Sequence, residues 1–216
     1  MLSKHSYTTT GGITFHYYLH TPENAEKNAP LLTFLHGAGE CGNTAEDLEI
    51  FRKNAGILSL MENYGLSLPV YALFPQCPRA YCWNDLVIFV RELIEHVADE
   101  LSSDRNRLYL TGLSMGGFGT WAMAIANPKM FAAIAPICGG GMAWAARTSL
   151  THMPIWAFHG DADDVVLPRN SIEMVDEINK YGGNAKLTIF HGVGHNSWDD
   201  AYLNTRLIPW LLEQKK

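Results

Sequence analysis

Short apolar runs alternate with longer segments of helical periodicity along most of this 216-residue chain. This alternation constrains the possible folds more than any other feature. Short, nearly continuous apolar runs suit strands that are buried on both faces, as in a parallel sheet that is covered by helices on both sides. The chain has six such runs, at residues 31–35, 70–74, 108–110, 132–137, 155–158 and 187–190.

The segments between these runs are predicted to be helices. In the clearest of them, residues 85–102, apolar side chains recur at helical spacing along one face, and Asp85 is a suitable N-cap. The other predicted helices span residues 44–64, 116–127, 168–181 and 198–212.

Two further strand-like segments, residues 6–10 and 13–20, flank Gly11-Gly12 and predict an antiparallel hairpin at the edge of the sheet. A hairpin followed by strand–helix alternation predicts an α/β fold, with a mostly parallel twisted sheet and helices on both faces. The apolar content of 47% is enough for one sizeable core, so we expect a single domain over residues 1–216.

The sequence Gly112-Leu113-Ser114-Met115-Gly116-Gly117 directly follows one predicted strand and opens a predicted helix. A serine between small residues in a strand–turn–helix context is typical of a nucleophile elbow, in which the hydroxyl is lifted clear of the sheet. The first amides of the following helix then face whatever the serine attacks. The alternative interpretation is an ordinary glycine-rich connection between a strand and a helix.

A second glycine-rich turn, His36-Gly37-Ala38-Gly39-Glu40, follows the predicted strand at residues 31–35. Such a turn can aim a backbone N–H outward, and with the Met115 amide it would form an oxyanion hole. Ala38 is the preferred donor on this turn and Gly39 the second choice. His36 itself is expected to pack within the loop rather than to carry protons.

Two more polar segments follow the last two predicted strands. The first contains three competing aspartates, Asp161, Asp163 and Asp164, and the second contains His195 with His191 as its rival. A carboxylate in the first segment can orient a histidine in the second, which can then act as general base and general acid. The ordinary interpretation of these residues is turn chemistry and polar loop surface.

The chain order serine, acid, histidine is the order found in α/β-hydrolases. More narrowly, the sequence resembles the compact phospholipase/carboxylesterase and dienelactone-hydrolase-like branch, with its predicted-peptidase relatives. The matching pieces cover nearly the whole chain: LHGAGE at 35–40, PQCP at 75–78 with Trp83, GLSMGG at 112–117, HGDADDVV at 159–166 and GVGHNSWDDAY at 192–202.

This resemblance implies that Asp163, two positions before the paired valines, is the acid, and that His195 is the histidine of a triad with Ser114. It implies ester hydrolysis through an acyl-enzyme without a metal or an organic cofactor, and no familiar metal-ligand spacing occurs here. Relatives often have Glu-Arg-Gly after the oxyanion loop, whereas this chain has Glu40-Cys41-Gly42. The missing arginine removes any ion pair or substrate contact that it makes in those relatives.

Lids in this superfamily commonly precede the acid-bearing strand, but residues 138–153 hold only a glycine run and one short apolar segment. We therefore expect no cap domain and an open cleft for small-molecule esters of modest size, lined by Trp83 and Trp144. Trp198 is more easily explained by core packing. Two other function classes stay open: an acyl-protein thioesterase or small peptidase, and a non-catalytic ligand-binding protein of the same fold.

Charge and composition exclude several other roles. The net charge is −6 and there is no basic run, which argues against a nucleic-acid partner. No segment approaches the roughly 20 apolar residues that span a bilayer. With no signal peptide recognised, we expect a cytoplasmic protein with four free thiols, although a Cys77–Cys82 bridge is an alternative. The sequence does not constrain the oligomeric state.

Overall fold

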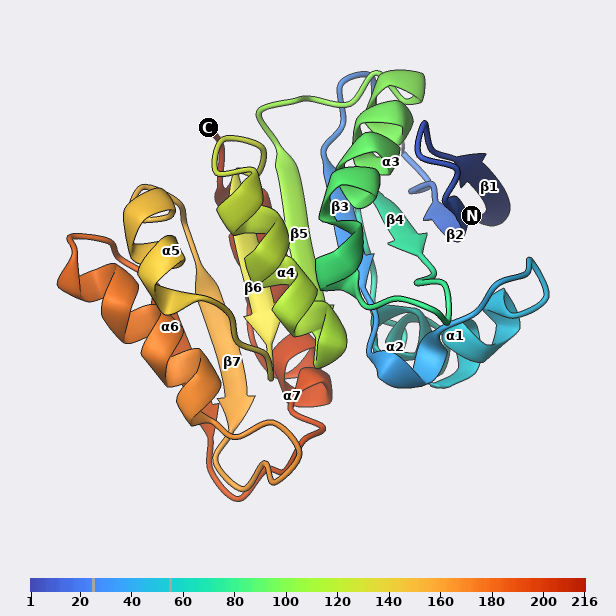
Figure 1. The fold of residues 1–216 in the computed structure, drawn as a ribbon. Helices are drawn as coiled ribbons and strands as arrows, with labels where there is room; N and C mark the ends of the chain where they lie inside the picture. The colour runs from blue at the N-terminus through green and yellow to red at the C-terminus, as the bar shows by residue number, and fades with distance from the viewer. Residues whose placement is uncertain (25, 55) are drawn as a thin grey trace.

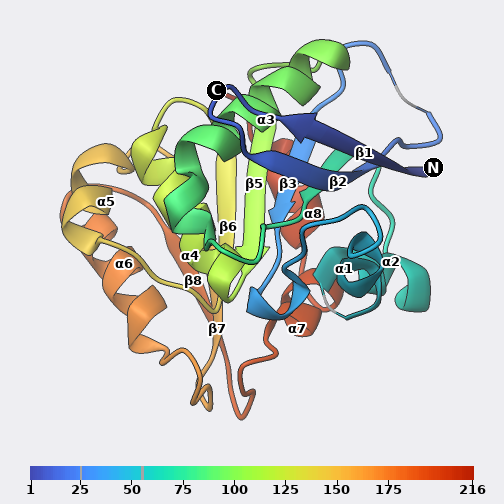
Figure 2. The same ribbon diagram turned by 45° about the vertical axis from the view of Figure 1, so that its right-hand side comes forward.

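The computed structural model describes residues 1–24, 26–54 and 56–216. Their strands form one eight-stranded sheet in the order β1-β2-β4-β3-β5-β6-β7-β8 (Figures 1 and 2). The strands are β1 (Leu2–Thr8), β2 (Thr14–His20), β3 (Leu31–Leu35), β4 (Tyr71–Pro75), β5 (Leu108–Leu113), β6 (Ala133–Ile137), β7 (Trp156–Gly160) and β8 (Lys186–Phe190).

The sheet has the predicted character. β1 and β2 form an antiparallel hairpin, β2 pairs antiparallel with β4, and every later neighbouring pair is parallel. The hairpin lies at the edge of the sheet as predicted, although its first strand begins earlier than residue 6. All six apolar runs became strands. β3, β5 and β6 are buried along their whole length, whereas residues 187–190 of β8 are only half-buried.

Helices cover both faces of the sheet, and the sheet divides the core into two layers (Figures 1 and 2). One layer packs under α3 (Val87–Glu100), α4 (Met115–Ala126), α5 (Ala143–Ser149) and α6 (Arg169–Lys180). The other packs under α1 (Leu48–Asn54), α2 (Gly56–Tyr64), α7 (Trp198–Leu203) and α8 (Leu207–Glu213). Between β6 and β7 the described chain contains only α5, so there is no cap domain. Every described helix is too short or too polar to cross a bilayer.

Two predicted helices are each divided in the structure. The segment 44–64 contains α1 and α2, and α2 begins at Gly56 with a φ of +71°, a conformation that interrupts a right-handed helix. The segment 198–212 contains α7 and α8. Pro209 lies in the first turn of α8, where its missing N–H costs no hydrogen bond, so the helix has to begin afresh just before it.

The N-cap prediction for Asp85 is wrong. A 3₁₀ turn, η2 (Trp83–Leu86), precedes α3, and the Asp85 carboxylate closes this turn by accepting the backbone N–H of Cys82 at 2.9 Å. Residues 83–86 carry the same apolar spacing as the helix, so periodicity alone does not separate the turn from the helix.

The pairing between β6 and β7 is the sparsest in the described sheet. It consists of the register pair Ile137–Phe158 and an isolated bridge between Ile134 and Ile155, whereas β7 and β8 pair along five positions. The last two strands with α6 are thus joined to the central sheet by few backbone hydrogen bonds.

Candidate active site

Ser114 occupies a strained turn between β5 and α4. Its φ of 53° and ψ of −117° lie in a region that is unfavourable for a residue with a side chain, as a nucleophile elbow requires. The turn is possible because the backbone packs closely around it: a Cβ on Gly116 would lie 1.9 Å from the Leu35 carbonyl oxygen. The small residues predicted for this turn are therefore required by contact.

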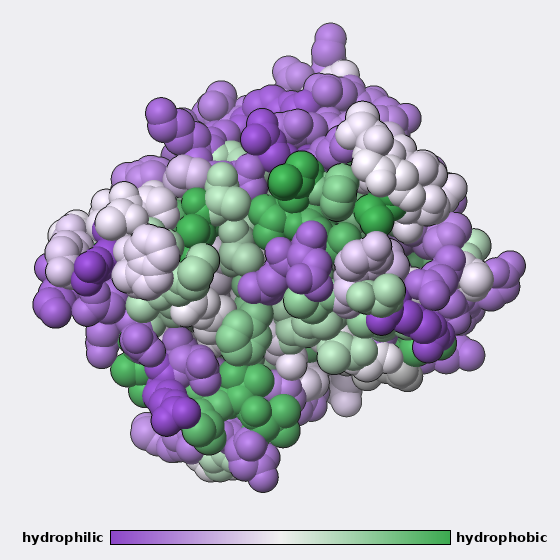
Figure 3. All heavy atoms as spheres, viewed as in Figure 1, coloured by the Kyte–Doolittle hydropathy of each residue, from purple (hydrophilic) through white to green (hydrophobic). Residues whose placement is uncertain are grey.

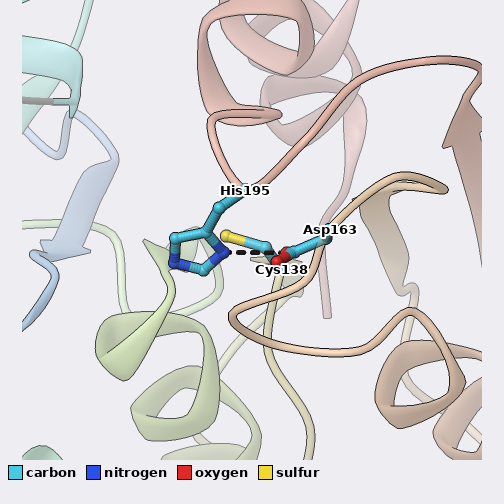
Figure 4. Close-up of side chains that lie close together, drawn as sticks. All are labelled: Cys138, Asp163 and His195. Carbon is cyan, nitrogen blue, oxygen red and sulfur yellow. Dashed lines mark hydrogen bonds and ion pairs between the residues drawn. The ribbon is translucent and has the colours of Figure 1, made fainter.

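Three loops at the carboxyl ends of the strands bring Ser114, His195 and Asp163 together. The Ser114 hydroxyl donates to His195 Nε2 at 2.9 Å. His195 Nδ1 in turn donates to Asp163 Oδ2 at 2.8 Å (Figure 4). Because Asp163 accepts, the hydrogen of the neutral imidazole is on Nδ1, which leaves Nε2 free to take the serine proton. The geometry is that of a nucleophile–base–acid triad, and the catalytic roles stay a prediction.

Asp163 is buried and anchored by its own loop. Its Oδ1 accepts the amides of Val165 at 3.0 Å and Val166 at 2.9 Å. Burial alone would raise the pKa of Asp163, but the hydrogen bonds from His195 and from these two amides outweigh it and hold the pKa below its ordinary value. The carboxylate is thus ionised and fixed where it faces the imidazole.

Cys138 lies behind the triad, directly after β6. Its Sγ accepts the Ser114 amide at 3.2 Å, and burial raises the pKa of the thiol to about 12. One ligand atom each from Cys138, Asp163 and His195 lies within 4.8 Å of the others (Figure 4), a set that a soft cation could use. A cation there would replace the Nδ1 proton of His195, which the triad needs, so these contacts favour proton transfer.

The oxyanion loop is a 3₁₀ turn, η1 (Ala38–Glu40), placed next to the serine. A Cβ on Gly37 would lie 3.8 Å from Ser114 Cβ, so the start of this turn and the elbow are in close proximity. The Met115 amide is the first of α4 and has no carbonyl in a preceding turn to bond. Both predicted donors, Ala38 and Met115, thus belong to turns beside the nucleophile, and their function as an oxyanion hole stays a prediction.

His36 supports this loop and carries no proton to the site. Its Nε2 accepts the Cys77 amide at 2.8 Å, its Nδ1 donates to the Gly37 carbonyl at 2.6 Å, and burial lowers the His36 pKa to about 4. The expectation that it packs within the loop is confirmed. The prediction that Trp83 lines the cleft is wrong: the indole is fully buried and donates to the His36 carbonyl at 2.9 Å.

Glu40 is a buried acid at the end of the same turn. Its Oε2 has no hydrogen-bond partner among the described residues, and burial raises the pKa of Glu40 despite bonds from the Gly37 and Glu40 amides. A raised pKa favours the protonated form in the folded state. Its contribution to stability is thus present at low pH and is lost as the pH rises through the raised pKa.

Replacing this acid by an uncharged amide tests that assignment. Glu40→Gln is expected to raise the melting temperature by roughly 2–4 °C at pH 8, where the wild type must bury or protonate the carboxylate, and to have little effect at pH 4. Thermal unfolding followed by circular dichroism at the two pH values gives the comparison. An equal change at both would mean that the charge of Glu40 does not affect stability.

The rival residues form a separate pair in the same two loops. His191 Nδ1 lies 2.8 Å from Asp161 Oδ2, and Asp161 Oδ1 accepts the Gly192 amide at 2.7 Å. The His191 side chain is 90% exposed, and the described contacts of this pair do not include Ser114. Asp161 and His191 thus brace the two loops against each other, while Asp164 is exposed.

These contacts assign unequal roles to the three aspartates. Asp163→Asn is expected to lower kcat/KM for a nitrophenyl ester by about 10³–10⁴-fold. The two amides keep the asparagine oxygen on their side, so its NH₂ faces His195 Nδ1 and forces the hydrogen onto Nε2. His195 can then no longer accept the serine proton.

Asp161→Asn and Asp164→Asn are the matched controls, since both remove one negative charge from the same loop. We expect each to stay within a few-fold of wild type. If Asp161→Asn were the most damaging of the three, the acid would have to be reassigned.

Two tryptophans differ in their relation to the site. The Trp198 ring lies 5.5 Å from the His195 ring in an edge-on arrangement and also packs against the core, in keeping with its interpretation as a packing residue. Trp144 in α5 is 64% exposed, and its role in substrate binding stays a prediction.

Two residues that touch the triad, Cys138 and His159, have no role that the sequence predicts. Cys138 was recognised only as one of four cysteines, all of which are free. His159 is buried in β7, directly after the apolar run of that strand, and contacts Asp163. A histidine directly after an apolar run and just before an acidic loop is the sequence signal for this position.

Residues 84–201, just over half of the chain, match the dienelactone hydrolase family. Among solved structures, a thermostable esterase superposes with a TM-score of 0.87 at 32% identity, over 100% of this chain and 63% of that one. The feruloyl esterase module of Clostridium thermocellum has a TM-score of 0.74 at 17% identity, over 99% of this chain and 88% of that one, and so shares the fold.

Curated relatives include poly(3-hydroxyalkanoate) depolymerase C of Paucimonas lemoignei, which is 26% identical over 77% of this chain. A bifunctional acetylxylan esterase/xylanase of Neocallimastix patriciarum is 28% identical over 69% of it. The chain spans only 48% and 21% of the lengths of these two proteins. With its fold, its strand-end motifs and the match over residues 84–201, the chain belongs to the dienelactone hydrolase family.

Proposed function

We propose that this chain hydrolyses carboxylic esters through an acyl-enzyme formed on Ser114. One observation carries the proposal: the continuous hydrogen-bond chain from the Ser114 hydroxyl through His195 to the buried Asp163. A serine hydroxyl is a weak nucleophile unless an adjacent base removes its proton. His195 is that base, and its hydrogen bond to Asp163 holds it in the required tautomer.

The reaction proceeds in two acyl-transfer steps. His195 Nε2 takes the Ser114 proton as Oγ attacks the ester carbonyl, and Asp163 stabilises the imidazolium that forms. The amides of Ala38 and Met115 bind the oxyanion of the tetrahedral intermediate. His195 then gives its proton to the leaving alkoxide, which departs as the alcohol. Water, activated by the same base, attacks the acyl-enzyme and releases the acid.

The apolar surface beside the triad is suited to binding substrates that have an apolar part. The loop after β7 carries Val165 and Leu167, which are 68% and 43% exposed, and the amide of Val165 bonds Asp163 directly. Apolar surface is visible over the loops at the lower end of Figure 3. This apolar surface, together with relatives whose names include acetylxylan and feruloyl esterases, supports a substrate class of modest-sized oxoesters with a small acyl or aryl group.

A fluorophosphonate probe and a matched substrate set test the proposal. We expect covalent labelling of Ser114 and a preference for a nitrophenyl oxoester over a thioester and an amide that carry the same acyl group. A preference for the thioester or the amide would change the substrate class to that of a thioesterase or amidase. An unreactive Ser114 in folded protein would instead indicate a non-catalytic binding protein.

A further inference from the structure

The carboxylate of Asp163 contacts two imidazoles. His159, the fully buried fourth residue of β7, places Nε2 3.1 Å from Asp163 Oδ2 and 2.7 Å from the Val166 carbonyl oxygen. The same Oδ2 accepts His195 Nδ1 at 2.8 Å. The carboxylate oxygen that orients the general base is therefore also in contact with a second histidine.

The neighbours of His159 determine where its hydrogens lie. Nε2 faces only acceptors, the Val166 carbonyl and the Asp163 carboxylate, so it must carry a hydrogen. Nδ1 lies 2.7 Å from Ser171 Oγ, which is itself 3.0 Å from the Gly139 carbonyl oxygen. The single Ser171 hydrogen goes either to Nδ1 of a neutral ring or to Gly139, in which case Nδ1 also donates. In both arrangements Nε2 carries a hydrogen, which is bonded to the Val166 carbonyl, and this N–H lies beside Asp163 Oδ2, 3.1 Å from Nε2.

The same contacts connect the acid to the elbow helix. Ser171 lies in the first turn of α6, and Gly139 follows β6. A Cβ on Gly117, in the first turn of α4, would lie 3.1 Å from Gly139 Cα, so the two backbones are packed together. A continuous set of buried contacts thus runs from Asp163 through His159 to the helix that begins at the nucleophile.

We propose that His159 is a positioning residue that holds Asp163 and limits the basicity of His195. This inference rests on the proposed function, since it assigns a role within the same triad. The positive end of the His159 N–H dipole, with Nε2 3.1 Å from Oδ2, stabilises the negative charge on that oxygen. The carboxylate therefore stabilises protonated His195 less strongly than an otherwise equal carboxylate without this neighbour would. His195 therefore stays neutral, and able to accept the serine proton, to a lower pH than it would without the contact between His159 and Asp163.

Other titratable groups near the triad do not change charge in the range that matters. Burial raises the pKa of Cys138 to about 12 and raises that of the fully buried Tyr202 well above its ordinary value, so both stay neutral. The charged side chains that flank the acid loop and start α6, Asp164 and Arg169, are exposed and screened by solvent. The exposed Asp161–His191 pair is screened in the same way.

Glutamine and asparagine at position 159 form a matched pair of variants. The glutamine amide reaches the position of Nε2 and keeps an N–H beside the Val166 carbonyl and Asp163. The asparagine amide reaches only the position of Nδ1, so it keeps the contact with Ser171 but leaves no N–H beside the Val166 carbonyl and Asp163 Oδ2. Both variants place an uncharged amide in the same buried site, so their costs to folding should be similar.

The measured quantity is the pH dependence of kcat/KM, whose acidic limb reports protonation of the base in the free enzyme. His159→Asn is expected to move the midpoint of that limb upward by roughly half to one pH unit and to lower kcat by about tenfold at unchanged KM. His159→Gln is expected to stay close to wild type on both measures. Tyr202→Phe removes a buried hydrogen bond to Thr111 at 2.7 Å and should leave the midpoint in place.

An unmoved midpoint in His159→Asn, with the variant folded by circular dichroism, would overturn the proposal and leave His159 a packing residue. Equal shifts in both variants would overturn the donor role and point to a positive charge on His159. If the wild type turned over no ester, the proposed function would have failed, and the same comparison would be made on the pH dependence of Ser114 labelling by fluorophosphonate. Absence of labelling in the wild type would reject both proposals.

Discussion

Turnover of a short-chain nitrophenyl ester is expected to fall by about 10⁵–10⁶-fold when Ser114 is replaced by alanine. The substitution removes the attacking oxygen and leaves no other hydroxyl in contact with His195 Nε2 among the described residues. Covalent catalysis is then lost, and only binding and electrostatic stabilisation of direct water attack are left. Initial rates and fluorophosphonate labelling, measured on the same preparations, give the comparison.

Ser103→Ala is the control serine variant, because Ser103 is buried and its hydroxyl has no hydrogen-bond partner among the described residues. It is expected to retain wild-type turnover. Activity in Ser114→Ala above a few per cent of wild type would assign the chemistry to another group and reject the acyl-enzyme route.

His195→Ala is expected to reduce kcat by a similar factor, about 10⁵–10⁶-fold, and to abolish labelling of Ser114 by the fluorophosphonate. Without the imidazole the Ser114 hydroxyl keeps its proton, and Asp163 loses one of its two imidazole partners. Because serine and histidine act as a unit, the double variant should lose little more than either single one.

The comparison with His191→Ala makes this result specific. His191 also donates to an aspartate from the same loop, at the same 2.8 Å, but it is exposed and bonded to Asp161. Its replacement should change kcat by no more than a few-fold. If His191 proved essential and His195 dispensable, the loop would have to adopt a different arrangement in solution from the one described.

The sequence predicts those parts of the fold that depend on local patterns. Buried strands show as apolar runs because helices cover both faces of the sheet, and the elbow shows as a run of small residues because its backbone contacts leave no room for side chains. Helix ends were less predictable: the break at Gly56 depends on one φ angle, and the break before Pro209 depends on where the helix begins again. Neither changes the apolar spacing.

The site was predictable where a residue type follows a strand and less so where tertiary packing decides. The conformation of Ser114 and its contact with His195 follow from the positions of the strand ends. The prediction for Trp83 failed because this residue is distant in sequence from the oxyanion loop, and only the folded chain brings the buried indole into its hydrogen bond with the His36 carbonyl. The contacts of His159 include Ser171 of α6, a helix that reaches the site only when the chain is folded.

The sparse pairing of β6 with β7 divides the triad between two parts of the sheet. Ser114 belongs to the central strands, whereas Asp163 and His195 belong to the edge unit of β7, α6 and β8, which is joined to the centre by one register pair and one bridge. Units with few connecting hydrogen bonds open at a lower free energy than the whole molecule. Backbone amides of the edge unit should therefore exchange with deuterium ahead of the central strands. As denaturant is added, activity should disappear while most of the secondary structure is still intact.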